Sequence, residues 1–194
     1  MTVPIDPIAV ALAVTRVFDA LGIVHTIGGS IASSIAGEPR STLDIDIVAA
    51  LRDTDVPALV TALSPDFYVS EKALRRAVRD RSSANLIHQA TQVKVDIFVA
   101  GGTPLDEQQL RRRRAVEISP GRSLHVHPPE DILLQKLHWY RKGGETSDRQ
   151  WRDILGIIRV QGPRLDRDYL TLNAPLLDVA DLLARALCEG CAPA

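Results

Sequence analysis

The sequence contains little cysteine and no long hydrophobic run. Its two cysteines, Cys188 and Cys191, form a single C-x-x-C, and no second pair of zinc ligands stands at a suitable spacing. We interpret them as incidental thiols in a reducing cytosol. No apolar run approaches the roughly 18 residues of a membrane span, and the N-terminus lacks the basic segment of a signal peptide. These absences predict a cytoplasmic protein with no membrane partner.

Aromatic residues and lysines are also scarce. Phe, Trp and Tyr make up 4% of the 194 residues, so the core must be built from aliphatic side chains. Only four of the 23 basic residues are lysines, and the formal net charge is −1. A near-neutral chain does not hold nucleic acid by overall charge alone. Two arginine-rich runs, 75–81 and 111–114, are either solvated helix faces or local surfaces that contact RNA phosphates.

Apolar periodicity predicts a mixed α/β region followed by helices, within a length that suits one domain. Helices are expected at 7–21, 30–35, 55–63, 71–80 and 104–113, and strands at 24–27, 43–48, 67–69, 85–88, 93–99, 115–118 and 124–126. Further helices are expected from Pro128 to Gly143, at 147–160 and at 175–187. We therefore predict an α/β core with a small mixed sheet over residues 1–127. A helical C-terminal subdomain over 128–194 would pack with it as one globular unit.

Two carboxylates share one face of the strand expected at 43–48. Asp44 and Asp46 are two residues apart and so point the same way, whereas Leu43, Ile45 and Ile47 point into the core. Like charges this close repel each other unless a cation lies between them. Hard oxygen ligands suit Mg²⁺. The alternative is the solvent-facing side of a half-exposed sheet.

A second alternating strand, at 93–99, places Asp96 and Lys94 on its polar face. If this strand lies beside the first, Asp96 completes a group of three carboxylates that could hold two metal ions. The alternative is a plain salt bridge between Lys94 and Asp96.

A glycine-rich turn precedes these strands. Gly28 and Gly29 follow a short strand and let the backbone approach a ligand closely, and Ser30 begins a helix whose first N–H groups can bind phosphate. Arg40, in the loop that follows, could also reach a phosphate. The alternative is an ordinary turn.

Together these motifs resemble the DNA polymerase β-type nucleotidyltransferase superfamily. The resemblance rests on Ile27-Gly28-Gly29-Ser30, on Asp44-Ile45-Asp46-Ile47 and on Val95-Asp96-Ile97. The loop 36–42, the segment 129–137 (PEDILLQKL) and the segment 148–154 (DRQWRDI) are similar to the AbiEii-like, MenT-type toxin group.

The resemblance implies a role for each matching residue. Asp44, Asp46 and Asp96 would bind two Mg²⁺ or Mn²⁺ ions and carry the catalysis. The nucleotide would be bound by the remaining predicted site residues, which are Gly28, Gly29, Ser30, Arg40, Lys136 and Asp153. Lys136 would also be catalytic, by acting on the nucleotide phosphates, and Asp153 would support Lys136 or the base-side pocket. Spacing alone allows Asp153 equally to pair with Arg149, one helical turn earlier.

The expected activity is the transfer of a nucleoside monophosphate from an NTP to a hydroxyl group. The resemblance implies a tRNA or other RNA acceptor, a toxin-like role and a cognate antitoxin as partner. The alternatives are a small-molecule nucleotidyltransferase of the aminoglycoside-modifying kind and a non-catalytic module that binds a nucleotide or a partner. The pair His125-x-His127 could bind a metal but lacks a third ligand nearby in the sequence.

Overall fold

The computed structural model describes residues 6–190, which divide into two compact units. Unit 1 comprises Met1–Ile31 and Thr42–Val126, and unit 2 comprises Ala32–Ser41 and His127–Ala194. Cys188 is an exposed free thiol, whereas Cys191 lies outside the described residues. Within residues 6–190, no helix is both long and apolar enough to span a membrane.

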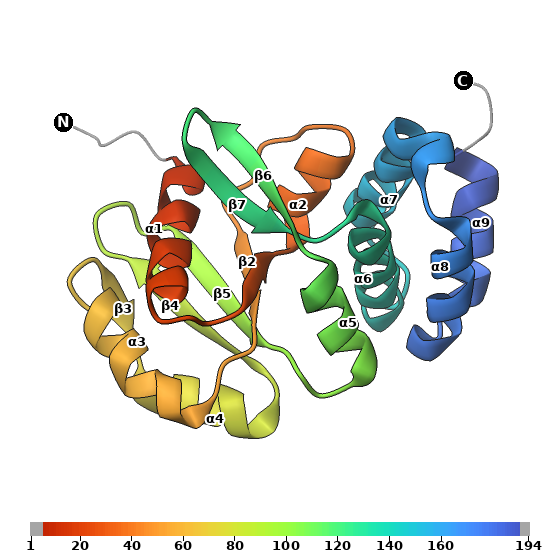
Figure 1. Ribbon diagram of the computed structural model, residues 1–194. Coiled ribbons are helices and arrows are strands. Elements are labelled where there is room, and N and C mark those ends of the chain that lie inside the picture. The colour runs from red at the N-terminus through yellow and green to blue at the C-terminus, as the bar shows by residue number, and fades with distance from the viewer. Residues whose placement is uncertain (1–5, 191–194) are drawn as a thin grey trace. The chain divides into compact units, whose positions relative to one another are not determined.

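Unit 1 is built on one seven-stranded sheet in the order β3-β4-β5-β2-β1-β7-β6 (Figure 1). Its strands are β1 (His25–Ile27), β2 (Ile45–Ala49), β3 (Phe67–Val69), β4 (Ser83–His88), β5 (Lys94–Val99), β6 (Arg114–Ser119) and β7 (Arg122–Val126). The pairs β2/β5 and β1/β7 are parallel, and the other neighbouring pairs are antiparallel. The predicted mixed sheet is therefore confirmed.

Four helices lie wholly within unit 1: α1 (Pro7–Ala20), α3 (Val56–Leu63), α4 (Glu71–Asp80) and α5 (Pro104–Arg112). Helix α1 begins where the side chain of Asp6 accepts hydrogen bonds from the N–H groups of Ile8 and Ala9, and Pro7 suits the first turn. Helices α1, α3 and α4 lie over one face of the sheet (Figure 1). They bury a largely aliphatic core, as the scarcity of aromatic residues predicts.

The strand β2 is shorter at its start than the alternation predicts. Ile45 and Ile47 are fully buried, as expected, but Leu43 is 57% exposed, so its predicted place in the core is wrong. The chain enters the sheet only at Ile45, because the N–H of Asp44 donates to Thr42 Oγ1 (3.2 Å) in a local contact. Asp44 therefore stands just before the strand rather than within it.

Helix α2 (Gly29–Ala36) starts in unit 1 and continues into unit 2. The loop after it fits closely against α7 (Asp148–Gln161) within unit 2. A Cβ atom at Gly37 would lie 2.9 Å from the backbone nitrogen of Ile157, so no larger residue fits there. Gln161 Nε2 also donates to the carbonyl oxygen of Ala36 (2.5 Å). These contacts explain why residues 32–41 group with the C-terminal helices.

The other helices of unit 2 are α6 (Pro129–Lys142), α7 (Asp148–Gln161), α8 (Arg167–Asn173) and α9 (Ala180–Gly190). Their apolar faces form one core that includes Leu133, Leu137, Ile154, Leu170 and Leu183. The single helix predicted at 175–187 is wrong at its start. A 3₁₀ turn (Ala174–Leu177) ends at Asp178, which adopts a left-handed φ of 56°, and α9 begins only after this break.

Candidate active site

The turn between β1 and α2 packs directly against Asp46. Gly28 continues the β1–β2 ladder by donating its N–H to the carbonyl oxygen of Asp46 (2.9 Å). Gly29 has a φ of +54°, and a Cβ atom there would lie 2.9 Å from the Cβ of Asp46 and overlap its carboxylate. Glycine is therefore required at position 29 for two reasons. The turn holds the start of α2 beside a carboxylate.

Asp46 and Asp96 are direct neighbours on the parallel strands β2 and β5, where their Cα atoms are register partners. The residues that alternate with them are fully buried: Ile45, Ile47, Val95 and Ile97 are each 0% exposed. Asp46 and Asp96 are partly buried on the opposite face, and Asp44 is exposed just before β2. The structure thus brings the two predicted strands side by side. We call Asp44, Asp46 and Asp96 the carboxylate group.

Lys94 pairs with one member of this group. Its Nζ lies 2.7 Å from Asp96 Oδ2, and its side chain is half exposed. The hydrogen bond to Asp96 is the main reason that the pKa of Lys94 is raised, and the charges of Asp44 and Asp46 raise it further against partial burial. All three carboxylates therefore act on one ammonium. The salt bridge considered from the sequence is present, and it stands where mutual repulsion requires a positive charge.

The carboxylate group is more open than a closed metal site. Among the described residues, the one group of three or more potential ligands with donor atoms all within 4.8 Å is a different one, Asp19, His25 and His125. Lys94 occupies one of the oxygens of Asp96 that a cation would use. The oxygen donors still suit a hard divalent ion.

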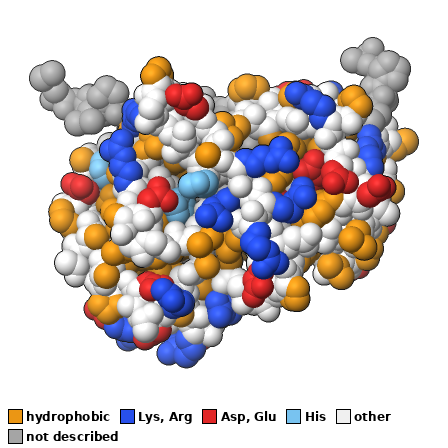
Figure 2. All heavy atoms as spheres, in the orientation of Figure 1, with side chains coloured by type: hydrophobic (Ala, Val, Ile, Leu, Met, Phe, Trp, Pro, Cys, Tyr) orange, Lys and Arg blue, Asp and Glu red, His pale blue; other side chains and the backbone are white. Residues whose placement is uncertain are grey.

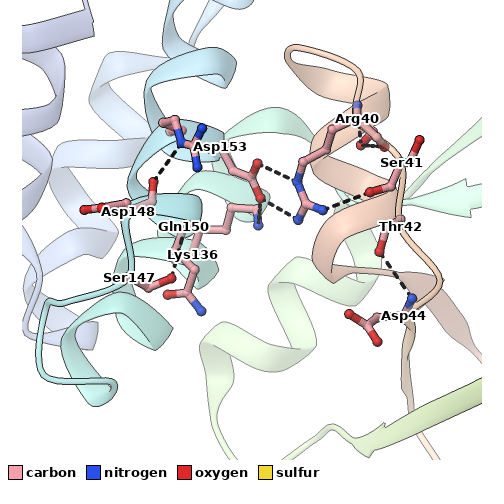
Figure 3. Close-up of polar contacts among 11 residues, drawn as sticks. Arg40, Ser41, Thr42, Asp44, Lys136, Ser147, Asp148, Gln150 and Asp153 are labelled. Carbon is pink, nitrogen blue, oxygen red and sulfur yellow. Dashed lines mark hydrogen bonds and ion pairs between the residues drawn. The ribbon is translucent and has the colours of Figure 1, made fainter.

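In unit 2, Arg40, Lys136 and Asp153 form what we call the salt-bridge cluster (Figure 3). Arg40 donates from Nε to Asp153 Oδ1 (2.9 Å) and from Nη2 to Oδ2 (3.0 Å), and Lys136 Nζ donates to Oδ2 (2.8 Å). The side chains of Asp153 and Lys136 are 8% and 10% exposed. The sequence left open whether Asp153 supports Lys136 or pairs with Arg149. In the structure Asp153 pairs with Lys136 and Arg40.

The electrostatics of this cluster favour an ionised Asp153. Burial raises the pKa of Asp153, but the hydrogen bonds from Arg40 and Lys136 outweigh it, so that the pKa is lowered overall. Two cations share one anion, and the cluster therefore has a net positive charge. Ser34 Oγ holds the loop by donating to the carbonyl oxygen of Arg40 (3.2 Å).

The acidic residues of the PED segment have structural contacts that the sequence did not indicate. Glu130 and Asp131 are almost fully buried at the start of α6. Tyr169 Oη donates to Asp131 Oδ1 (2.5 Å), and the N–H of Asp166 donates to Glu130 Oε1 (3.1 Å). Both carboxylates thus join α6 to the start of α8 within unit 2. Partners almost 40 residues away give no local signal in the sequence.

Four of the eight arginines in the two basic runs pair with carboxylates. Arg75 contacts Asp53 and Glu71, Arg76 and Arg79 contact Asp80, and Arg111 contacts Glu107. The face drawn in Figure 2 accordingly shows blue basic side chains interspersed with red acidic ones. This pattern favours solvated, locally neutralised helix faces for these arginines.

The seven-stranded mixed sheet, with its helices and the glycine turn beside β2, is a nucleotidyltransferase-like fold. An antigenic nucleotidyltransferase-like protein from Paracoccidioides brasiliensis has a similar structure, with a TM-score of 0.60 and 22% identity over 93% of this chain and 91% of that one. The antibiotic-resistance factor ANT(2'')-Ia has a TM-score of 0.54, with 13% identity over 94% of each chain.

The lincomycin-bound lincosamide antibiotic adenylyltransferase LnuA has a TM-score of 0.50, with 13% identity over 76% of this chain and 93% of that one. No protein-family model and no curated protein matches the sequence. At these identities the similarity defines the fold alone, and chemistry has to be argued from the residues.

Proposed function

We propose that this protein is a divalent-metal-dependent nucleotidyltransferase that moves a nucleoside monophosphate from an NTP to a hydroxyl acceptor. One observation carries the proposal: Asp46 is the register partner of Asp96 and also packs against Gly29 at the start of α2. Carboxylates for a cation and a backbone cradle for phosphate are thus adjacent. Nucleotidyl transfer needs little beyond such positioning and charge neutralisation.

The phosphates of the NTP would bind at the start of α2. The first N–H groups of a helix have no acceptor inside the helix, and its dipole favours an anion there. Gly28 and Gly29 keep the turn free of side chains, and Ser30 adds a hydroxyl group. These three residues would hold the phosphate chain and orient its α-phosphorus toward the acceptor.

The carboxylate group fits Mg²⁺ or Mn²⁺, because it offers hard oxygen donors and already surrounds the ammonium of Lys94. Asp44, Asp46 and Asp96 would be the ligands, and the bound metal would neutralise charge on the phosphates during transfer. Lys94, half exposed, is free to turn toward solvent when its place on Asp96 is taken.

The reaction forms a bond between the acceptor oxygen and the α-phosphorus and breaks the bond from that phosphorus to pyrophosphate, which leaves. Asp96, on β5, would accept the proton of the acceptor hydroxyl. Lys136 would add positive charge toward the phosphates, as the family resemblance implies. Asp153 and Arg40 would fix the position of the Lys136 ammonium through the salt-bridge cluster.

For the acceptor, the resemblance to MenT-type toxins supports an RNA hydroxyl, with tRNA first among the candidates and a cognate antitoxin as partner. A specific observation favours a second candidate, a small hydroxylated molecule. Two of the similar structures, ANT(2'')-Ia and LnuA, are an antibiotic-resistance factor and an antibiotic adenylyltransferase, and each matches along at least 93% of its own length. Such proteins need no large surface for the acceptor.

The test is to incubate the purified chain with each α-labelled NTP and Mg²⁺ or Mn²⁺. Total tRNA is offered in one arm, and a panel of aminoglycosides and lincosamides in another. Label on RNA supports the first acceptor, and label only on an antibiotic supports the second. Asp46→Asn should abolish transfer, whereas Asp66→Asn, at an exposed position elsewhere in unit 1, should not. NTP binding without transfer in any arm, measured by calorimetry, would contradict catalysis and leave a binding module.

A further inference from the structure

A second group of polar side chains gathers in unit 1, away from the proposed chemistry. Asp19 lies in the last turn of α1, His25 begins β1, and His125 lies on β7. Together with Arg113 they line a cavity of about 160 Å³. The sequence pointed to His125 only within a His-x-His pair that lacked a third ligand. The fold supplies two other ligands for His125 from the N-terminal part of the chain, and His127 belongs to unit 2.

His25 is an unusual residue for the inside of a sheet. It is 1% exposed, and its ring packs between Phe18 and His125 at centroid distances of 5.3 and 5.7 Å. His25 Nδ1 lies 3.0 Å from the carbonyl oxygen of Ile23, a hydrogen bond in which only the imidazole can donate. Its Nε2 is buried and has no hydrogen-bond partner among the described residues. A buried nitrogen of this kind normally has a partner.

The same hydrogen bond prepares His25 as a ligand. Donation from Nδ1 to a backbone carbonyl fixes the tautomer and places the lone pair on Nε2, the arrangement typical of metal-binding histidines. Burial is the main reason that the pKa of His25 is lowered, and the charges of His125 and Arg113 lower it further. The hydrogen bond to Ile23 and the charge of Asp19 only partly offset these effects.

Asp19 and His125 complete the donor set. One ligand atom from each of Asp19, His25 and His125 lies within 4.8 Å of the other two. Asp19 Oδ1 lies 3.9 Å from His25 Nδ1, the nitrogen that donates to Ile23, so the exposed side chain of Asp19 would have to turn toward Nε2 to share a metal ion with it. Two imidazoles and one carboxylate favour zinc or another divalent transition metal over Mg²⁺. We propose that Asp19, His25 and His125 bind one divalent transition-metal ion, with zinc as its representative.

Arg113 provides the sharpest internal control. Its Nη1 donates to the carbonyl oxygen of Leu110 (3.0 Å), and its buried Nε has no partner among the described residues. A guanidinium beside a cation weakens its binding, whereas the same group would strengthen the binding of an anion. Removing the Arg113 charge therefore shifts the affinities of a cation and an anion in opposite directions.

The experiment uses the full chain without an affinity tag, in a background that carries Asp44→Asn and Asp46→Asn so that the carboxylate group does not compete. Zinc affinity is measured by competition with a chromophoric chelator. We expect one equivalent of zinc, bound at least about tenfold more weakly in Asp19→Asn and in His125→Gln. Arg113→Gln should bind it more tightly, and Asp66→Asn and His88→Gln should not change. Both ligand variants avoid the fully buried His25, so the fold is preserved and is checked by thermal melting.

A spectroscopic measurement separates ligation from a structural role. Zinc should shift the ¹⁵N resonance of His25 Nε2 in the background protein, and at the same free zinc concentration it should shift it less in Asp19→Asn. Three results would overturn the proposal: no stoichiometric zinc binding in that background, zinc affinity unchanged in both ligand variants, or binding of inorganic phosphate that Arg113→Gln abolishes. The outcome is independent of nucleotidyl transfer, which depends on other residues.

Discussion

The two charged clusters of the molecule solve opposite electrostatic problems. In unit 1, the carboxylate group gathers three like charges around one half-exposed lysine. In unit 2, the salt-bridge cluster surrounds one buried aspartate with two cations. In the first, three carboxylates act on one ammonium, whereas in the second, two cations share one carboxylate. Under the proposed function, a cation bound from outside would add positive charge to the carboxylate group, whereas the charges of the salt-bridge cluster already pair with one another.

The largest expected effect is on activity in unit 1. Asp46→Asn should lower kcat at least about 10²–10³-fold, the typical cost of removing one preorganised electrostatic contact. In the absence of metal, the melting temperature of Asp46→Asn should equal that of the wild type or be slightly higher, because one repelling charge is removed. Steady-state transfer of labelled nucleotide and a thermal melt measure the two effects. A variant that melts much lower would mean that Asp46 holds the fold together rather than the substrate.

The corresponding change in unit 2 should act mainly on stability. Asp153→Asn leaves Lys136 and Arg40 without their shared anion, and breaking a buried ion pair costs about 3 kcal/mol of unfolding free energy. Denaturation by urea measures the loss. Asp148→Asn, at an exposed position on the same helix, is the matched control and should cost less than about 1 kcal/mol. An Asp153→Asn protein as stable as the control would show that the cluster contributes no net stabilisation.

The stabilisation by Asp153 should disappear in acid. The pKa of Asp153 is lowered in the folded state, so its contribution is complete above the unfolded value of about 3.9 and is lost as the pH falls through the folded value. The difference in stability between the wild type and Asp153→Asn should therefore be constant from pH 7 to about 5 and should shrink below about pH 4. Urea midpoints of both proteins across this range provide the measurement. A difference that grows toward low pH would contradict the ionised form.

Much of the fold and part of the site were predictable from the sequence. Strict alternation marked β2 and β5, because each buries one face completely, and the polar positions on both strands were Asp46 and Asp96. Gly29 was recognisable because two glycines follow a strand, and the structure adds the positive φ and the contact with Asp46. Local physics determines these features, so a local pattern reveals them.

Other features depend on contacts between distant parts of the chain. Arg40 and Asp153 are 113 residues apart, and nothing near either one indicates the pair. Asp19 and His25 join His125 only because β1 and β7 are neighbours, which strand patterns do not specify. The prediction that Leu43 lies in the core was wrong for a different reason. A hydrogen bond to Thr42 keeps Asp44 out of the sheet, and an alternating pattern does not show where a strand begins.

The smallest expected effect is that of replacing Lys94, which supplies the positive charge beside the carboxylate group. Lys94→Met removes the ammonium that occupies Asp96, so that Mg²⁺ no longer competes with it. An exposed ion pair contributes about 0.2–1 kcal/mol, so Mg²⁺ should bind up to about fivefold more tightly. Without metal, the variant should melt slightly lower, because the three carboxylates lose the ammonium on which they all act.

Melting temperatures measured across a range of Mg²⁺ concentrations give both quantities in one experiment, since a ligand that binds only the folded state stabilises it by RT ln(1 + [L]/Kd). Lys72→Met, at an exposed position on α4, is the matched control and should follow the wild type. Weaker Mg²⁺ binding in Lys94→Met would mean that the lysine completes the site instead of competing for it. The carboxylate group would then resemble the salt-bridge cluster, as a pairing satisfied within the protein, and the contrast between the two units would disappear.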